Sequence, residues 1–345
     1  MDATNKRMLQ EQKNIKKVKL VKDNLISEGC YPKIFSRPVN LQLELTSNCN
    51  CRCKHCYNRS GGNHAPDLMT PERWKKFCLN LVENGGILQS TISGGEPLLL
   101  GDNLWDIMDI LHNDGTIFNL ITNGYLFNQN VLEHVKRYRF YWVQFSIDNF
   151  ISDFHDKFRG VAGIWRRVAE AAYKTALSGI PVRIASTITP RDINNLEKFV
   201  QMAINLGASY YIIGEVIPSG RAFDNPDIML SEADRNIFYS EMDRLVKKYK
   251  KEITILMSGS QRTQLEYAAT GAIDGAIIRP DGNIRLDCDC PFVIGNVLKD
   301  NIFEVWKEKS NCWQHPSVKK YIESCDPISG KNSYMGNYNQ DDILL

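Results

Sequence analysis

The stretch that decides the fold is a short alternating segment that runs directly into a cluster of cysteines, VNLQLELTSNCNCRCKHCY (residues 39–57). In its first half Leu41, Leu43 and Leu45 alternate with polar residues, which is the pattern of a strand with one buried face. Four of the ten cysteines then follow between Cys49 and Cys56. The sequence therefore predicts a cysteine-rich loop at the carboxyl end of a strand.

Strand-like and helix-like segments alternate from this loop to about residue 216. Strands are expected at 91–93, 117–122, 142–147, 182–187 and 210–216, and helices at 71–83, 105–112, 165–177 and 196–206. Repeated strand–helix units with short connections give a parallel sheet with helices outside. About six units are counted, fewer than the eight of a closed barrel. The predicted fold class is therefore α/β, a partial (β/α)6 TIM-like barrel with its active site at the carboxyl ends of the strands.

The sequence divides into four segments. They are a basic leader (1–38), the partial barrel (39–222), a smaller C-terminal domain (223–325) and a polar tail (326–345). We expect the leader to be a solvated helix or a loose tail. The smaller domain should hold a charged helix at 232–250 and a β-hairpin of strands 276–278 and 284–286, because Pro-Asp-Gly-Asn between apolar segments forms a turn. The tail has little to bury and is expected to be disordered or to act as a lid.

Composition restricts the partners and the compartment. The formal net charge of +2 is too small for an obvious nucleic-acid or membrane partner. Neither a run of 18 apolar residues nor an export signal occurs, so we expect a cytoplasmic protein. Cysteines in that compartment are thiols, metal ligands or catalytic groups rather than a disulfide framework.

Three of the clustered cysteines are spaced as metal ligands. The pattern Cys49-x3-Cys53-x2-Cys56 supplies three thiolates from one short loop. Thiolates are the usual ligands of iron–sulfur clusters, and three of them leave one iron of a [4Fe–4S] cluster without a protein partner. An open position is the general arrangement of catalytic metals. We therefore expect chemistry at the open iron.

This CxxxCxxC spacing, with Tyr57 directly after it, resembles the signature of the radical S-adenosylmethionine (SAM) enzymes. The resemblance implies that the open iron chelates the amino and carboxylate groups of SAM. It also implies that one electron from the cluster splits SAM into methionine and a 5'-deoxyadenosyl radical, which abstracts a hydrogen from the substrate.

Two points about the cysteines stay open. A structural zinc site built from the four residues Cys49, Cys51, Cys53 and Cys56 is the alternative, although zinc ribbons normally take their ligand pairs from separated turns. Cys51 lies between the first two expected ligands, where the family does not need a cysteine. We expect it to face away from the cluster.

Further motifs that resemble the family follow at later strand ends, in the order that a radical SAM barrel requires. They are Ser93-Gly94-Gly95-Glu96-Pro97, similar to the GGE motif, then Thr122-Asn123-Gly124, Ser146-Ile147-Asp148, the HDxxRG-like segment 155–160 and the PxGRA-like segment 218–222. The resemblance assigns to SAM the residues Tyr57, Gly94, Gly95, Glu96, Thr122, Asn123, Ser146, Asp148, Arg159 and Arg221. In this assignment Glu96 accepts the ammonium group and Arg159 pairs with the carboxylate of SAM.

Several of these motifs also have a plainer interpretation. Gly-Gly-Glu-Pro and Asn-Gly are common turns. Asp148 is of a type that often caps helices, and a histidine such as His155 is more often a surface or capping residue. Ser186 or Thr187, at the end of the fifth strand, could be a SAM ligand or an ordinary strand hydroxyl.

The C-terminal part is similar to a SPASM or Twitch domain. The resemblance rests on 279–284, on Gly295-Asn296-Val297 and on Phe303-Glu304-Val305-Trp306. Such domains usually carry auxiliary iron–sulfur clusters, yet the cysteine spacing here matches no SPASM pattern. Either an auxiliary cluster or a cluster-free Twitch-like fold is compatible with Cys288, Cys290, Cys312 and Cys325. Cys30 and Cys78 are expected to be structural.

The resemblance favours radical chemistry on a ribosomally made peptide or protein, because maturases of such peptides dominate the subgroup. It implies a low-potential electron donor of the flavodoxin or ferredoxin type. The alternatives are radical SAM chemistry on a small molecule or tetrapyrrole in cofactor synthesis, and a non-enzymatic zinc-binding interaction protein on a decayed barrel. The sequence does not separate crosslinking, epimerisation and decarboxylation as outcomes.

Overall fold

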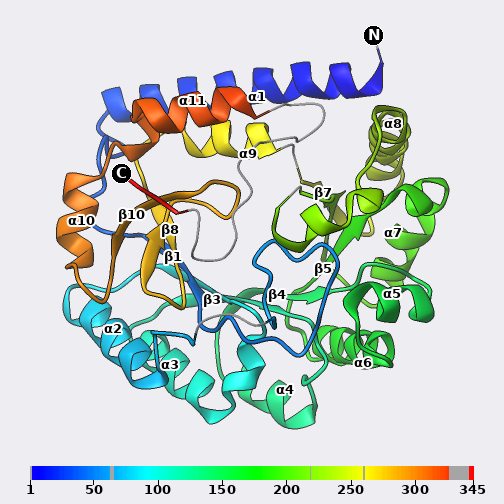
Figure 1. Cartoon of the computed structure of the whole chain (residues 1–345), viewed down its shortest axis with the longest axis horizontal. Helices are drawn as coiled ribbons and strands as arrows, with labels where there is room; N and C mark the ends of the chain where they lie inside the picture. Colours follow the sequence, from blue (N-terminus) through cyan, green and yellow to red (C-terminus); the bar gives the residue numbers. More distant parts are fainter. Residues whose placement is uncertain (1, 63–65, 218, 259–260, 326–341) are drawn as a thin grey trace.

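The computed structural model describes residues 2–62, 66–217, 219–258, 261–325 and 342–345. Eleven strands of these residues form one sheet in the order β11-β10-β9-β8-β1-β2-β3-β4-β5-β6-β7. The strands lie inside, and helices α2 to α8 surround them on the outside (Figure 1). The predicted α/β fold with a largely parallel, partial barrel is thus confirmed.

The strands and helices have the following bounds. The strands are β1 (Asn40–Glu44), β2 (Gln89–Ser93), β3 (Ile117–Thr122), β4 (Phe140–Ser146), β5 (Val182–Ile188), β6 (Tyr210–Glu215), β7 (Thr254–Met257), β8 (Gly275–Ile278), β9 (Asn283–Arg285), β10 (Phe292–Asn296) and β11 (Ile343–Leu344). The α-helices are α1 (Ala3–Ser27), α2 (Pro71–Glu83), α3 (Asp102–Asn113), α4 (Gln129–Val135), α5 (Ser152–Arg159), α6 (Ile164–Leu177), α7 (Leu196–Asn205), α8 (Glu232–Tyr249), α9 (Gln261–Ala268), α10 (Ile302–Glu308) and α11 (Pro316–Ser324). All predicted strands and helices of the barrel are present within a few residues of their expected ends.

The first strand–helix unit shows why the barrel forms. Leu41 and Leu43 of β1 are fully buried, as the alternation predicts. Helix α2 begins where Thr70 caps it and Pro71 opens its first turn, and it buries Trp74 against the sheet. Trp74 donates its indole N–H to the carbonyl of Leu45 at 3.0 Å. This contact fixes the end of β1 directly before the cysteine loop.

The C-terminal hairpin continues the barrel sheet and does not build a second one. Strand β8 pairs in parallel with β1, opposite β2, and β9 pairs antiparallel with β8. Strand β1, which carries the cysteine loop, is therefore an interior strand of the sheet.

A seventh parallel strand extends the sheet beyond the predicted six units. Helix α8, expected as part of the smaller domain, leads into β7, which pairs in parallel with β6. Strand β7 was not predicted, because it has only four residues and alternates exposed with half-buried positions.

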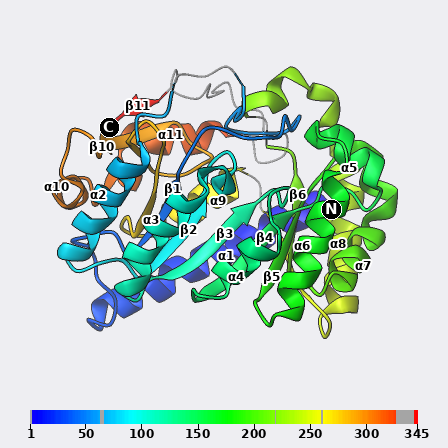
Figure 2. The same ribbon diagram turned by 90° about the horizontal axis from the view of Figure 1, so that it is seen from below.

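The basic leader is not a loose tail. Residues Ala3–Ser27 form one helix, α1, that packs against α8 and α9. It runs along the open side of the sheet, beside α9 (Figures 1 and 2). Its buried Glu11 accepts a hydrogen bond from the hydroxyl of Thr263 at 2.8 Å and pairs with Arg7. The docking of α1 was not predicted, because the segment is rich in lysine and the helix docks partly through polar side chains.

The predicted polar tail falls largely outside the described residues, at 326–341. Its last residues are ordered against the C-terminal hairpin, where β11 pairs in parallel with β10. Asp342 accepts hydrogen bonds from the buried guanidinium of Arg279 at 2.9 Å. Among the described helices, none combines the length and the apolar character that crossing a bilayer requires.

Candidate active site

The predicted site residues meet at the carboxyl ends of the strands. They line a cavity of about 360 Å³, a size typical of small-molecule sites. Twelve of the thirteen predicted residues lie on its wall, and only Glu96 does not. The loops after β1, β2, β3 and β4 supply most of them, as the parallel topology requires.

Backbone hydrogen bonds hold the cysteine loop on the neighbouring loops. The amides of Arg52 and Lys54 donate to the carbonyls of Arg159 and Phe158, at 2.9 and 3.1 Å. Arg221 donates its amide to the carbonyl of Cys56 and its Nε to that of Cys53, at 2.9 and 2.8 Å. Arg221 therefore orders the backbone of the loop, besides lining the cavity.

Two side-chain donors point at the cysteine sulfurs. Asn123 Nδ2 lies 3.8 Å from Cys49 Sγ, and Arg159 Nη1 lies 3.8 Å from Cys53 Sγ. The hydrogen bond from Cys51, together with the charge of Arg159, lowers the pKa of Cys53 to about 5 against the opposing effect of burial. Such an environment favours thiolates, which are the form that binds metal.

Cys51 does not face away from the site, contrary to the expectation. It is buried, lines the same cavity and shares hydrogen bonds with the thiols of Cys49 and Cys53. These bonds come first among the effects that lower the pKa values of both neighbours and raise that of Cys51. Cys51 thus lies on the same cavity wall as the two expected ligands, and its backbone amide donates to Cys49 Sγ at 3.4 Å.

The two glycines after β2 allow this loop to lie against the cysteine loop. The amides of Gly95 and Glu96 donate to the carbonyls of Thr46 and Asn48, at 2.6 and 2.9 Å. A Cβ on Gly94, whose φ is +134°, would lie 2.5 Å from the carbonyl oxygen of Thr46. A Cβ on Gly95 would lie 2.6 Å from the carbonyl carbon of Asn48. Larger residues are therefore excluded by backbone atoms, whatever the ligand.

Glu96 lies behind the cavity wall. It is fully buried and accepts hydrogen bonds from the amides of Leu98 and Asn123 and from the hydroxyl of Thr122, at 3.2, 2.8 and 2.8 Å. Burial raises its pKa to about 7 despite these donors. In this structure Glu96 joins the loops after β2 and β3, and its role toward SAM stays a prediction.

Arg159 pairs with Asp148 inside the protein. Its Nε and Nη2 both lie 2.8 Å from Asp148 Oδ2, and both side chains are buried. Burial is the largest single effect on Asp148 and would raise its pKa, but Arg159, the two histidines His55 and His155 and the amide of Thr187 together lower it. The ring of His155, also buried, accepts the amide of Asp148 at 3.1 Å through Nδ1. His155 is therefore part of the support for Asp148 rather than a surface residue.

The remaining predicted residues line the cavity with their own partners. The Tyr57 hydroxyl donates to the buried carboxylate of Glu44 at 2.9 Å. Ser146 and Thr187 lie on the wall, and the Thr187 amide donates to Asp148 Oδ1 at 3.1 Å. Ser186 donates to the carbonyl of Ile147 at 2.5 Å.

Two further wall residues were missed by sequence reasoning. His55, inside the cysteine motif, stacks on Phe158 with ring centroids 4.8 Å apart, and its Nε2 lies 4.0 Å from Asp148 Oδ2. Glu215 ends β6 and accepts Arg235 Nε at 2.6 Å. Glu215 could have been predicted from the sequence. Strand β6 was itself predicted, and site residues lie at the carboxyl ends of the strands.

The four C-terminal cysteines lie away from this cavity wall. Cys290, Cys312 and Cys325 are buried within the hydrophobic core, and burial raises the pKa values of Cys290 and Cys312. Cys288 lies in the loop between β9 and β10, with a carboxylate on either side in the sequence.

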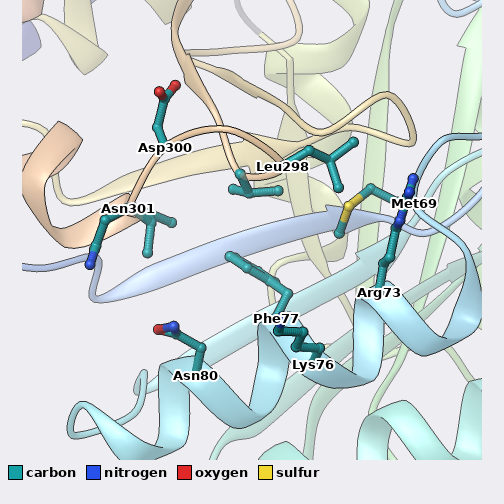
Figure 3. Close-up of a pocket in the computed structure, with 10 residues that line it drawn as sticks. Met69, Arg73, Lys76, Phe77, Asn80, Leu298, Asp300 and Asn301 are labelled. Atoms are coloured by element: carbon teal, nitrogen blue, oxygen red, sulfur yellow. The ribbon is translucent and has the colours of Figure 1, made fainter.

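A second cavity, of about 390 Å³, lies between α2 and the segment 297–302 (Figure 3). Met69, Phe77 and Leu298 give it an apolar floor, and Arg73 and Lys76 lie at its side. None of the predicted site residues lines it. It is therefore separate from the cysteine site.

Comparisons with known proteins agree with this geometry. Mycofactocin maturase MftC of Mycobacterium tuberculosis is 30% identical over 293 residues, which cover 79% of this chain and 71% of MftC. The antilisterial bacteriocin subtilosin biosynthesis protein AlbA of Bacillus subtilis is 26% identical over 84% of this chain, and the match spans 64% of AlbA, less than two thirds of its length. The AdoMet-dependent heme synthase of Methanosarcina barkeri is 27% identical over 78% of this chain and 82% of the synthase.

The fold is also similar to that of a solved structure. The crystal structure of Streptococcus suis SuiB bound to precursor peptide SuiA matches with a TM-score of 0.62 and 16% identity, over 88% of this chain and 69% of SuiB. The sequence model of the radical SAM superfamily matches residues 43–204, which contain the cysteine loop and the loops after β2 to β5. The chain therefore belongs to the radical SAM superfamily.

Proposed function

We propose that the chain is a radical SAM enzyme that holds one [4Fe–4S] cluster on Cys49, Cys53 and Cys56. The observation that carries the proposal is that these thiols share one cavity with Arg159 and Asn123, whose N–H groups point at two of the sulfurs. Donors of this kind stabilise thiolates and tune an iron–sulfur cluster. When bound, the cluster and SAM supply the reductive cleavage of SAM and a radical that takes a hydrogen from the substrate.

The chain's own residues hold and shape this site. Because Gly94 and Gly95 have no side chains, the backbone of their loop lies close to the cysteine loop. Arg221 binds a backbone carbonyl of the cysteine loop and holds it in place. Asp148 neutralises Arg159 in a buried position, which keeps the guanidinium beside Cys53. We propose SAM contacts for the cavity-lining residues Tyr57, Thr122, Asn123, Ser146, Asp148 and Arg159, with Glu96 acting from behind the wall.

Anaerobic reconstitution tests the proposal. The protein is loaded with iron and sulfide, reduced with dithionite in the presence of SAM, and assayed for 5'-deoxyadenosine by mass spectrometry. We expect the product in the wild type and in Cys78→Ser, which removes a buried thiol of α2, and none in Cys53→Ala. Zinc in place of iron on these cysteines, with no SAM cleavage, would support the interaction-protein alternative instead.

We infer that the substrate is a ribosomally made peptide. Support comes from the similarity to mycofactocin maturase and to a bacteriocin biosynthesis protein, and from the fold shared with SuiB, which was solved with a precursor peptide. Co-expression with short peptides encoded beside the gene should change their mass, and the Cys53→Ala enzyme should leave it unchanged. If no neighbouring peptide is ever modified, the peptide proposal fails.

Similarity to a heme synthase favours a second candidate, radical chemistry on a tetrapyrrole or another small molecule. The two candidates differ in what accelerates SAM cleavage. A tetrapyrrole that increases 5'-deoxyadenosine formation and changes in mass, while peptides have no effect, would establish this second function.

We propose that an acidic, low-potential electron carrier of the flavodoxin or ferredoxin type docks beside Cys53, in the cytoplasm. Lys54, Lys157 and Arg191 are exposed around a small outer pocket, in which the carboxylates of Asp148 and Asp192 are buried. Asp148 lines this pocket and the main cavity, so only a thin wall separates them. Facing charges of opposite sign speed association.

Charge reversal tests the docking face. Lys157→Glu should slow reduction of the cluster by a reduced flavodoxin at low ionic strength, without changing reduction by dithionite. Lys198→Glu, an exposed lysine outside the outer pocket, is the matched control. Equal rates for both variants with flavodoxin would exclude this face.

The proposal requires one cluster, and an auxiliary cluster on the C-terminal cysteines is the alternative. Roughly four irons and four sulfides per chain correspond to one cubane, and about eight of each correspond to two. Iron and sulfide analysis after reconstitution decides between them.

A further inference from the structure

Three potential metal ligands meet in the loop between β9 and β10. Carboxylate oxygens of Asp287 and Asp289 and the sulfur of Cys288 all lie within 4.8 Å of one another. The backbone positions the group, because the amide of Asp289 donates to Asp287 Oδ1 at 2.9 Å and so turns the chain back on itself. The three side chains therefore point to one place, although they are consecutive in sequence.

The carboxylate of Asp289 is not satisfied by the described residues. The side chain is 5% exposed, and its Oδ2 has no hydrogen-bond partner there. Its Oδ1 lies 3.7 Å from Cys288 Sγ, which also lies 3.6 Å from Asp287 Oδ1. One thiol proton cannot serve both carboxylates at once. Buried polar atoms without partners are rare and ask for a specific explanation.

The charges of the group are not balanced either. Arg285 is the cation that acts on all three side chains, and it uses its Nε to donate to the carbonyl of Cys290 at 2.7 Å. A buried carboxylate, a half-buried one and a thiol beside Arg285 are costly unless further positive charge is present.

We propose that Asp287, Cys288 and Asp289 bind a divalent transition-metal ion of borderline softness, such as Zn²⁺ or Fe²⁺. The ion gives the unsatisfied Asp289 oxygen a partner. With Arg285, it balances the three negative charges of a thiolate and two carboxylates. A thiolate among the ligands selects such ions over Mg²⁺ and Ca²⁺, which take oxygen ligands.

The donor set resembles catalytic metal sites in one respect. Three protein ligands leave at least one position for water or for a donor atom of another molecule. The site is distinct from the cysteine loop, and its existence does not depend on SAM cleavage. It also differs from an auxiliary cluster, because Cys290, Cys312 and Cys325 are not ligands.

Zinc binding to the reconstituted, full-length protein tests the proposal. With the first cluster in place, Zn²⁺ is added, the protein is desalted, and zinc, iron and sulfide are measured per chain. We expect one zinc beyond the cluster iron, with no additional sulfide. Cys288→Ser and Asp289→Asn should each weaken zinc binding by at least about tenfold, because each removes a ligand.

Matched controls separate the site from other thiols and carboxylates. Cys290→Ala and Cys312→Ala remove neighbouring buried thiols, and Asp227→Asn removes an exposed carboxylate. All three should keep the zinc. The triple variant Cys49→Ala/Cys53→Ala/Cys56→Ala should also keep the zinc. This variant distinguishes failure of the proposed radical function from failure of the zinc site.

A thermal melt guards against misfolding of the variants. Zinc should raise the melting temperature of the wild type but not of Asp289→Asn. Without metal this variant should melt at the wild-type temperature or above it, because it loses an unpaired buried charge. Zinc bound equally by all variants overturns the proposal. So does a second set of four irons and four sulfides that is lost in Cys290→Ala, which would be an auxiliary cluster.

Discussion

Replacing Gly95 with alanine should displace the cysteine loop. The added Cβ would overlap the carbonyl oxygen of Asn48 and lie 2.6 Å from the carbon of that carbonyl, whereas ordinary contact begins at 3.4 Å. The loops must therefore separate by at least about 0.8 Å, because neither side of the contact is a movable side chain. A shift of that size lengthens the 2.9 Å hydrogen bond from Glu96 N to Asn48 O to about 3.7 Å, beyond hydrogen-bonding distance.

The cost follows from these contacts. Overpacking at a close backbone contact costs about 1–3 kcal/mol, and losing one or two loop hydrogen bonds costs about 1 kcal/mol each. We expect the free energy of unfolding of the cluster-free protein to fall by about 2–5 kcal/mol, as measured by urea denaturation. Iron incorporation should fall with it, because the displaced segment adjoins Cys49.

Gly62→Ala is the matched control. A Cβ at this position meets only the carbonyl oxygen of Arg59, at an ordinary distance of 3.4 Å. Its stability should equal or slightly exceed that of the wild type, because alanine restricts the unfolded chain. If Gly95→Ala matches Gly62→Ala in both unfolding free energy and iron content, then the steric reasoning about the two loops is refuted.

Three further predictions concern the buried groups of the site. Arg159→Met leaves Asp148 buried without its counter-charge and should lower the free energy of unfolding by about 3–5 kcal/mol; the double variant with Asp148→Asn should recover part of this loss in a double-mutant cycle, and strictly additive effects would argue against the pair. The raised pKa of Glu96, about 7 against an ordinary 4.5, means that the folded state holds its proton more tightly, so the contribution of this group to stability is complete below pH 4.5 and is lost as the pH rises through 7. Urea titrations from pH 5 to 8 should therefore show a decline of up to about 3 kcal/mol that Glu96→Gln abolishes, and an unchanged slope in that variant would contradict the assignment. Cys51→Ser should keep four irons per chain, because three other thiols suffice as ligands, and loss of the cluster in this variant would make Cys51 a ligand.

Local sequence patterns predicted the barrel strands well, and twelve of the predicted site residues line one cavity. The alternation before the cysteines, the caps of α2 and the glycines after β2 each act over a few residues, so the sequence displays them directly. The orientation of Cys51 and the inward turn of Glu96 could not be predicted in this way. They depend on backbone and side-chain groups of other loops, such as the donors Thr122 and Asn123, whose positions follow from the complete fold.

The ends of the chain were the hardest to predict. Helix α1 docks through Glu11 and Thr263, a polar contact between residues 252 positions apart. The periodicity of a single segment does not indicate a contact with a residue so far along the chain. Strand β7 is too short for its pattern to be distinctive. The C-terminal hairpin was predicted as a hairpin, yet its place beside β1 is a matter of sheet order, which local patterns do not encode.

This sheet order has a consequence for biosynthesis. Strand β1 is made early, but its partner β8 lies far downstream, with Leu43 opposite Ile278. At roughly 5–20 residues per second, a ribosome needs on the order of ten to fifty seconds to translate the intervening chain. Throughout that interval the nascent protein exposes one unpaired edge of the strand that leads into the cysteines, and such edges invite aggregation. Chaperone supply and translation speed should therefore govern the yield of recombinant protein, and iron delivery during translation should matter less than delivery after chain release.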